Sequence, residues 1–509
     1  MNTLPLIDIL IIVFYLIAMI GVGVYFSRKN SNADQFTKAS GQIPGWALGI
    51  SFYATFLSSN TFLGVPGKSF GSNWNSFVFS LSMPVAAWIA TRYFVPFYRK
   101  SGAISAYTHL EHRFGAWART YAMLCFVLTQ LARMGSIFFG IALTLEALTG
   151  IDMRTIMAVS GACIIVYTML GGMEAVIWTE VAQGVIKTIG ALAVLIIVMV
   201  HMEHGAADII SIGQAHHKFS LGSPSLTDFT TSTFWVVFFY GVFANLGNFG
   251  VDQNYVQRYH TARTEREATR SIWLCVYWYV PVSMMFFFIG TALFAYYEQH
   301  PDLIAALKAQ VAATKGVAVS ALTPADYGDK VLPHFMVTQV PHGLLGLIVA
   351  AILSAAMSTI SSGMNSSATV FLKDIYQRYV NPDMTQKAEM RVLYIATAVM
   401  GVLAIVTGVA MIGVKSILDL WWLLSGIFSG AMLGLFLLGM ISRTAGNASA
   451  KIATVVGVIV IAWMTFSPML PEEYAGLRSA LHTNMVIVVG TLSIFLVGIL
   501  VAKGIKHKA

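Results

Sequence analysis

The residues that most clearly suggest chemistry are hydroxyl and amide side chains inside a long apolar segment. Five of them recur at helical spacing and so share one face of a helix: Ser354, Ser358, Ser361, Ser362 and Asn365. Lipid cannot hydrogen-bond such a face, which must therefore point toward protein, water or an ion. Helix packing through small side chains is one interpretation. A row of oxygen ligands for a hard cation is the other, and the density of oxygens, with Thr359 beside the five, favours it.

One arginine carries charge where lipid would otherwise surround it. Arg133 lies near the middle of an apolar segment expected at residues 116–148. A central arginine costs about 2.5–3.5 kcal/mol on insertion scales, so it normally faces a partner or an aqueous cavity. Either Arg133 pairs with an internal acid, or it binds an anionic or hydroxylated solute. No acid stands three or four positions away on the same span.

Glu180 and Lys187 are charged residues of a later segment, expected at residues 177–202. Glu180 suits either a helix-start carboxylate or a cation ligand. Lys187 lies about two helical turns further along. The pattern favours a lysine that snorkels toward the interface or pairs with Glu180.

The composition places these residues in a membrane protein. The chain has 509 residues, of which 57% are hydrophobic and 11% are charged. Many apolar runs reach the length that spans a bilayer as a helix, which predicts an all-α polytopic membrane protein with the lipid bilayer around it. The net charge of +8 does not indicate nucleic acid, because Lys and Arg lie mostly in short loops. The three cysteines, in separate apolar segments, indicate no disulfide or metal framework.

The hydropathy pattern predicts about thirteen transmembrane helices. They are expected near residues 6–27, 44–66, 74–98, 116–148, 152–170, 177–202, 231–250, 272–297, 333–373, 389–412, 417–441, 450–468 and 481–503. Residues 299–330 form the longest outer connection, with a short amphipathic helix near 305–317.

Basic residues gather in every second loop. Arg99 and Arg113 follow the third span, Arg258 and Arg266 follow the seventh, and Lys373 follows the ninth, whereas the opposite loops carry fewer. The positive-inside rule then predicts an N-terminus outside and a C-terminus in the cytoplasm. The expected location is the bacterial inner membrane.

Two spans are interrupted by polar and glycine-bearing stretches, at residues 53–67 and 241–253. When the spans are grouped as one, five, five and two, each interrupted span opens a group of five. Because five is odd, the second group is inverted relative to the first. Interrupted spans at matching positions of inverted halves indicate a transporter's binding site, and a kinked structural helix is the alternative for either one.

This grouping predicts a single transporter domain, residues 1–509, with an inverted five-plus-five repeat. A leading helix at 6–27 comes first, then the first repeat at 44–202, the second at 231–441 and two C-terminal helices at 450–503. The sequence contains neither HExxH nor GxSxG, and residues 64–69 lack the first glycine of a phosphate loop. We therefore expect no enzyme, and we predict no obligate protein partner.

Four stretches together resemble the sodium/solute symporter family: residues 54–62, 171–180, 251–259 and 355–367. The resemblance covers nearly the whole chain, from Asp8 to the eleventh span. It implies the inverted repeat fold with one helix before it. Within the family, the chain is most similar to the bacterial sodium/sialic acid symporters.

The resemblance implies sodium as the coupling ion, with one ion in a first site and a second site as an open alternative. The first would lie between the broken second span and the serine helix, held by Ala54, Leu57, Ala355, Ser358 and Thr359. The second would be held by an acid and two serines: Glu180, Ser361 and Ser362. The sialic acid subgroup has an aspartate where this chain has Glu180.

The resemblance also implies a solute site on the second, third, fourth and seventh spans. The matching positions are Phe56, Ser58, Ser59, Thr61, Ser80, Arg133 and Asn245. Phe56 replaces a threonine of the sialic acid subgroup, and Ser80 replaces a glutamine. The implied function is sodium-coupled uptake of sialic acid (N-acetylneuraminate), with a neutral sugar or a monocarboxylate as the alternative solute.

Two aromatic sites each have two competing interpretations, which rest on their positions in the sequence alone. Phe249 is a candidate inner gate, and core packing is the alternative. Trp421 and Trp422 suit an interfacial aromatic belt, and gating a cavity is the alternative. A channel or a sensor of the same fold, and an intramembrane enzyme, are the other functional classes that we considered.

Overall fold

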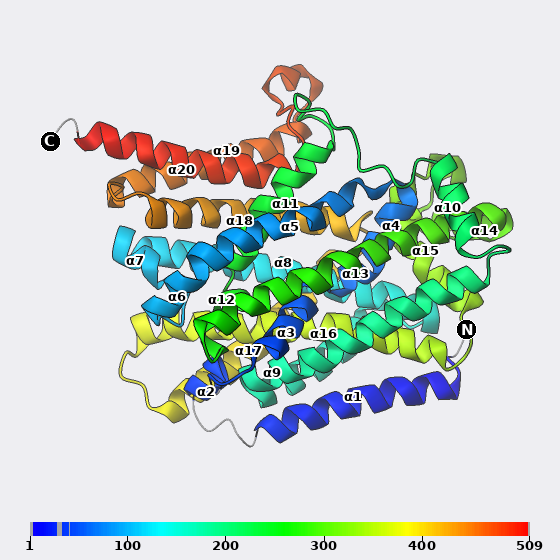
Figure 1. Ribbon diagram of the computed structural model, residues 1–509, viewed down its shortest axis with the longest axis horizontal. Coiled ribbons are helices and arrows are strands. Elements are labelled where there is room, and N and C mark those ends of the chain that lie inside the picture. The colour runs from blue at the N-terminus through cyan, green and yellow to red at the C-terminus, as the bar shows by residue number, and fades with distance from the viewer. Residues whose placement is uncertain (1–3, 28–32, 40, 507–509) are drawn as a thin grey trace.

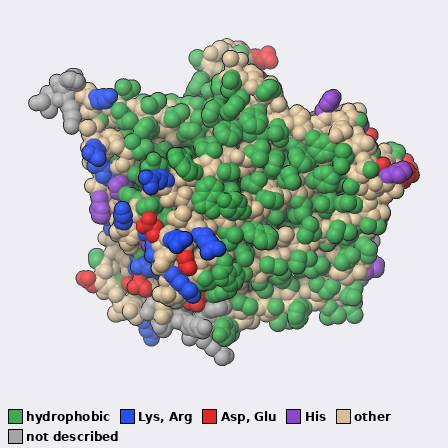
Figure 2. All heavy atoms as spheres, viewed as in Figure 1, with side chains coloured by type: hydrophobic (Ala, Val, Ile, Leu, Met, Phe, Trp, Pro, Cys, Tyr) green, Lys and Arg blue, Asp and Glu red, His purple; other side chains and the backbone are tan. Residues whose placement is uncertain are grey.

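The computed structural model describes residues 4–27, 33–39 and 41–506, and this part of the chain is helical, with one isolated bridge between Ile43 and Ala262. The long helices run side by side, and the two termini lie at opposite ends of the bundle (Figure 1). Hydrophobic side chains cover most of the face seen in Figure 2, while Lys and Arg gather at the end where the C-terminus lies. The all-helical membrane fold predicted from composition is confirmed.

Eleven helices of the described residues are long and apolar enough to cross a membrane. The first half of the chain contains α1 (Leu6–Ser27), α2 (Ala33–Lys38), α3 (Gly45–Phe56), α4 (Ser59–Gly71), α5 (Val78–Ile89), α6 (Val95–Ser101), α7 (Thr108–Phe114), α8 (Ala116–Thr149), α9 (Met153–Val200) and α10 (Ala206–Ala215). A five-residue π-helix at 90–94 joins α5 to α6.

The second half contains α11 (Phe234–Val251), α12 (Gln253–Thr261), α13 (Glu265–Gln299), α14 (Pro301–Lys315), α15 (Pro324–Gln339), α16 (Leu344–Val370), α17 (Gln386–Ala410), α18 (Ile417–Ile441), α19 (Asn447–Phe466) and α20 (Met485–Lys506). The amphipathic helix expected near 305–317 is α14. The repeat boundaries at 44–202 and 231–441 stay a prediction.

Both interruptions predicted in the second and seventh spans are present. Between α3 and α4, Leu57 and Ser58 have extended backbones. Between α11 and α12, Asp252 is extended and its side chain accepts a hydrogen bond from the backbone of Asn254. The second interruption falls at the very end of the predicted span, and α12 carries the chain on to Thr261. The expected end at residue 250 agrees with the end of α11 at Val251.

One predicted span was wrong. The span expected at 333–373 is two helices, α15 and α16, because Pro341 lacks an N–H and Gly343 takes a left-handed φ of +87°. The Asp8 carboxylate accepts hydrogen bonds from the backbone of Gly343 (2.7 Å) and Gly346 (2.6 Å), which caps the start of α16. The two spans expected at 152–170 and 177–202 are present as the apolar segments Met153–Met169 and Gly172–Val200 of α9, which meet at a kink at Gly172 with a φ of +58°.

Helix α16 lies at the centre of the bundle, in contact with α1, α3, α8, α9 and α17. All its residues from Ile348 to Val370 are buried, although the serine face is strongly polar. The face predicted to avoid lipid therefore points into protein. It lies against α3 and α9, where the charged residues of the core are found.

Candidate functional site

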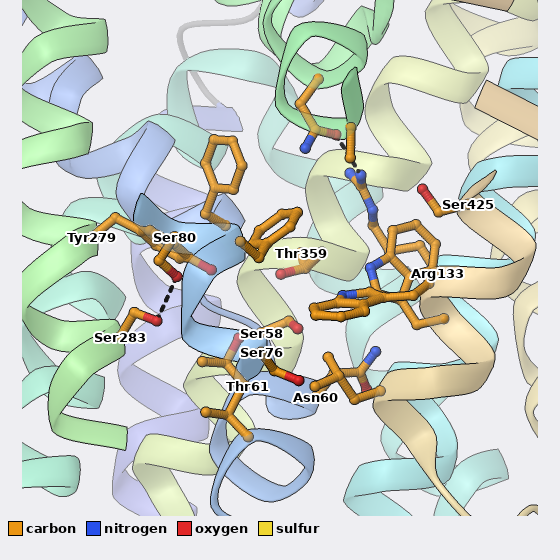
Figure 3. A pocket seen from close by; sticks show the side chains of 18 of the residues that line it. Ser58, Asn60, Thr61, Ser76, Ser80, Arg133, Tyr279, Ser283, Thr359 and Ser425 are labelled. Atoms are coloured by element: carbon orange, nitrogen blue, oxygen red, sulfur yellow. Dashed lines mark hydrogen bonds between the residues drawn. The ribbon is translucent and has the colours of Figure 1, made fainter. Parts of the chain in front are cut away.

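A cavity opens beside the interruption of α3 and α4, between the two halves of the bundle (Figure 3). Its polar wall consists of hydroxyl and amide side chains with one guanidinium: Ser58, Asn60, Thr61, Ser76, Ser80, Ser283, Thr359, Ser425 and Arg133. Its apolar wall is largely aromatic: Phe56, Phe79, Tyr240, Tyr255, Tyr279, Phe287, Trp421 and Trp422. Aromatic faces with a few convergent polar groups suit a small hydroxylated ligand.

The interruption itself directs polar groups into this cavity. Because Leu57 and Ser58 leave the helical conformation, the carbonyls of the last turn of α3 have no partner within the helix. The Ser58 side chain then lines the cavity from one side, and Ser80 lies across from Arg133 in Figure 3. Ser80 shares a hydrogen bond of 2.7 Å with Ser283.

Arg133 reaches the cavity from α8 with a partner that the sequence did not reveal. Its guanidinium lies 3.3 Å from the carboxylate of Asp252, and it donates to Asn248 Oδ1 at 3.1 Å. The guanidinium also lies over the ring of Trp421, 4.9 Å from the centroid. Asp252 is 119 positions further along the chain, at the break of the second interrupted span, so inspection of the arginine's own span could not find it.

Five of the seven predicted solute residues line the cavity: Phe56, Ser58, Thr61, Ser80 and Arg133. Two do not line it. Ser59 donates to the carbonyl of Ile137 at 3.2 Å. Asn245 donates to Ser82 at 3.3 Å, behind the cavity wall.

Phe56 and Tyr255, which line the cavity, pack against a further aromatic ring that does not line it, that of Phe249. Phe249 is fully buried, and its ring lies 5.4 Å from that of Phe56 and 5.9 Å from that of Tyr255. The tryptophans expected at the interface instead line the cavity, and Trp422 separates it from an outer pocket that also contains Lys68 and Asp419. The interfacial-belt interpretation was therefore wrong, because these rings contact cavity groups.

The five residues predicted to hold the first sodium ion do come together, around a lysine. Lys187 Nζ donates to the carbonyl of Ala54 (2.6 Å), the carbonyl of Leu57 (2.8 Å) and Ser358 Oγ (2.9 Å). The Ala355 carbonyl accepts from Ser358 (3.1 Å) and Thr359 (3.3 Å) on the same wall. Lys187 neither snorkels nor pairs with Glu180 directly.

These oxygens do not fit a sodium ion while Lys187 points at them. An ammonium group has three N–H donors, and each of the three is taken up by one of these oxygens. A sodium ion would need the same lone pairs in the same place. Two unit positive charges about 4 Å apart also repel by about 4 kcal/mol at an effective dielectric constant near 20. The lysine and the ion therefore exclude each other.

The second predicted sodium position holds a guanidinium in the same way. Arg258 Nη2 donates to both oxygens of Glu180 at 2.8 Å, to Ser362 Oγ at 2.7 Å and to Thr55 Oγ1 at 2.9 Å. Ser362 and Ser51 also donate to the Glu180 carboxylate. Ser361, the third predicted residue, instead donates to the Ser358 carbonyl at 3.2 Å.

Lys187 and Arg258 are the site residues that sequence reasoning missed. Arg258 was expected to be a cytoplasmic loop charge, but it lies on α12 with 1% of its surface exposed. The helical pattern of residues 253–261, directly after an interrupted span, was the feature that could have placed it inside. For Lys187, the spacing of seven from Glu180 indicated the same helix face, although it did not indicate which oxygens the ammonium would bind.

Comparison with known proteins settles the family. A model of the sodium:solute symporter family matches residues 36–457. The chain belongs to the sodium:solute symporter family. The sodium/sialic acid symporter NanT of Aliivibrio fischeri is 33% identical over 97% of this chain and 92% of its own. The sodium/sialic acid symporter SiaT of Proteus mirabilis is 32% identical over 94% and 93%.

Solved structures agree with this membership. A substrate-bound, outward-open structure of a Na⁺-coupled sialic acid symporter matches with a TM-score of 0.86 at 31% identity, over 98% of both chains. The closed structure of the nucleobase-cation-symport transporter Mhp1 matches with a TM-score of 0.53 at 16% identity, over 93% of this chain and 95% of its own. The second likeness concerns the fold alone. The predicted family and the predicted inverted-repeat transporter fold, known as LeuT-like, are both confirmed.

Proposed function

We propose that this protein is a symporter that imports sialic acid, N-acetylneuraminate, by secondary active transport. The observation that carries the proposal is the cavity, which combines one guanidinium with many hydroxyl groups. A sugar acid offers the matching chemistry, a carboxylate for the arginine and several hydroxyls for Ser58, Thr61 and Ser80. The two sodium/sialic acid symporters at 32–33% identity support the same solute.

Arg133 has a donor left for the solute. Its Nη1 makes no hydrogen bond to any described residue, although it lies near Asp252. A carboxylate entering the cavity would accept from this nitrogen while Asn248 keeps its hold on Nη2. Phe56, Ser58, Thr61, Ser80 and Arg133 form the proposed solute site. Ser59 and Asn245 support its walls from behind.

Family membership and the names of the relatives support sodium as the coupling ion of this group of transporters. The protein is a multi-pass membrane protein. We further propose that it lies in a bacterial inner membrane with its N-terminus outside, since the basic residues gather at the opposite end (Figure 2). Phe249, below the cavity, then closes it toward the cytoplasm.

Calorimetric titration of the purified protein tests the solute directly. N-acetylneuraminate should bind, while galactose, which lacks the carboxylate, and lactate, which lacks most of the hydroxyls, should bind at least about tenfold more weakly. Proline serves as an unrelated solute. Stronger binding of galactose, lactate or proline would overturn the proposal.

A further inference from the structure

Three charged side chains with no exposed surface meet between α9, α12 and α16: Lys187, Glu180 and Arg258, here called the cation cluster. Lys187 donates hydrogen bonds to the carbonyls of Ala54 and Leu57, at the break after α3, and to Ser358. Arg258 rests on Glu180 and Ser362. Each cation therefore contacts residues to which the family resemblance gives a sodium ion.

The net charge of the cluster equals the net charge that one carboxylate and two sodium ions would have. One carboxylate with two sodium ions has a net charge of +1. Glu180 with Lys187 and Arg258 also has a net charge of +1, and here both cations are covalently part of the chain. A third cation at either position would meet oxygens that already accept hydrogen bonds from Lys187 or Arg258. The polar environment of α16 thus holds two protein cations with the net charge that two sodium ions would give.

Among the described residues, no second carboxylate contacts the cluster to bind an additional cation. In this region α3 contributes Ser51, Tyr53 and Thr55, and α16 contributes hydroxyl and amide groups without a carboxylate. On α1, Tyr15 accepts a hydrogen bond from Gln183 at 3.3 Å. Glu180 is the acid of the cluster, and Arg258 neutralises it.

We propose that Lys187 and Arg258 stand in for the two sodium ions in this chain, so that sodium is neither required for solute binding nor the ion that drives its transport. The tethered ammonium does the structural work expected of the first ion: it joins the interrupted turn at Ala54 and Leu57 to Ser358 of α16. That turn carries Ser58 into the cavity. The solute site is thereby held in shape by a charge that never leaves the protein.

The first experiment needs no solute. Thermal unfolding of the purified protein is compared in sodium chloride and in choline chloride at equal ionic strength. A ligand that binds the native state raises its stability, so the parent protein should show the same unfolding temperature in both salts. Sodium-specific stabilisation of the parent protein would overturn the proposal.

A variant that lacks the lysine side chain makes the unfolding experiment more decisive. Lys187→Ala removes the ammonium and leaves the three oxygens free, so sodium-specific stabilisation should appear in the variant. Lys218→Ala is the matched control, because Lys218 is another buried lysine on carbonyls, those of Phe70 (2.7 Å) and Ser72 (3.0 Å), outside the cluster. The control should gain no response to sodium. A folded Lys187→Ala variant that sodium does not stabilise would contradict the proposal, and if the variant does not fold, the parent protein's result decides.

The second experiment uses the solute and rests on the proposed function. N-acetylneuraminate affinity should agree within about twofold in sodium and in choline, and uptake into proteoliposomes should not rise with an inward sodium gradient. An affinity that increases about tenfold or more with sodium would overturn the inference. If N-acetylneuraminate binds in neither salt, the proposed solute is wrong, while the unfolding experiment still decides whether protein cations replace sodium.

Discussion

The cation cluster and the solute cavity share helix α3 but differ in how completely their polar atoms are paired. In the cluster, each donor of Lys187 has an oxygen, and the Glu180 carboxylate accepts from Arg258, Ser51, Thr55 and Ser362. In the cavity wall, Arg133 Nη1 and Asn60 Oδ1 are buried and have no hydrogen-bond partner among the described residues. Buried polar atoms normally find a partner. The cluster is therefore complete as it stands, whereas the cavity gains bonds when a ligand enters.

This difference in hydrogen-bond pairing determines where a ligand can bind. In the cluster a new cation must first displace a protein group, whereas in the cavity a polar solute satisfies groups that otherwise cost free energy. Thr55 and Thr359 belong to both regions, because each lines the cavity. Thr55 also accepts a hydrogen bond from Arg258, and Thr359 donates one to the carbonyl of Ala355 beside Ser358. A change in either region should therefore be felt in the other.

The largest effect is expected from breaking the cluster. Arg258→Met leaves Glu180 buried without a cation, which should cost about 3–5 kcal/mol of unfolding free energy. Denaturant unfolding in detergent measures the loss. The double variant Arg258→Met with Glu180→Gln removes both charges and should recover much of it. A loss below about 1 kcal/mol in the single variant would show that Glu180 does not depend on the arginine.

The next effect belongs to the cavity. Arg133→Ala removes the guanidinium that faces the solute, and a hydrogen bond to a charged group contributes about 1.5–3 kcal/mol, so affinity for N-acetylneuraminate should fall about tenfold or more. Calorimetric titration gives the affinity. Arg133→Lys is the control for charge, and it should restore the pairing with Asp252 better than the binding, because lysine lacks the two-pronged geometry. Unchanged affinity in Arg133→Ala would remove the arginine from the solute site.

A smaller effect is expected at the floor of the cavity. Phe249→Leu loses the aromatic contacts with Phe56 and Tyr255, worth about 0.5–1.5 kcal/mol each. If Phe249 is the inner gate, solute should exchange across proteoliposome membranes faster than in the parent protein. Phe62→Leu, which removes a buried ring packed on Phe286 and absent from the cavity lining, is the control. Equal exchange rates in the two variants would favour core packing as the role of Phe249.

The smallest effect is expected at the outer end of the bundle. Lys68 and Asp419 form an ion pair of 2.8 Å, but their side chains are 33% and 48% exposed. Exposed pairs contribute about 0–1 kcal/mol, so Lys68→Met should change stability by less than that. Unfolding of the parent and the variant at low and high salt measures the contribution of this ion pair to stability, since salt screens exposed pairs more than buried ones. A loss comparable to that of Arg258→Met would abolish the contrast between exposed and buried charges.

Much of the fold could be predicted from the sequence because its determinants are local. Hydropathy over 18 or more residues marks a span, and a polar face at helical spacing marks a helix that avoids lipid, as α16 does. The interruptions of α3 and α11 were visible as polar stretches within apolar runs. The error of boundary arose where apolar residues continue through a break, at the turn before α16.

The sequence by itself determined the membrane class, the interrupted helices, the serine face and the family, while tertiary structure alone decided which charges pair. Arg258 lies 78 positions from Glu180, Lys187 lies 133 positions from Ala54, and Arg133 is paired with an acid at the break between α11 and α12. Hydropathy and periodicity describe one segment at a time, so they show that a buried charge needs a partner without naming it. The partner follows from how α9, α12 and α16 pack together, and in this chain that packing places two of its own cations where its family suggests sodium.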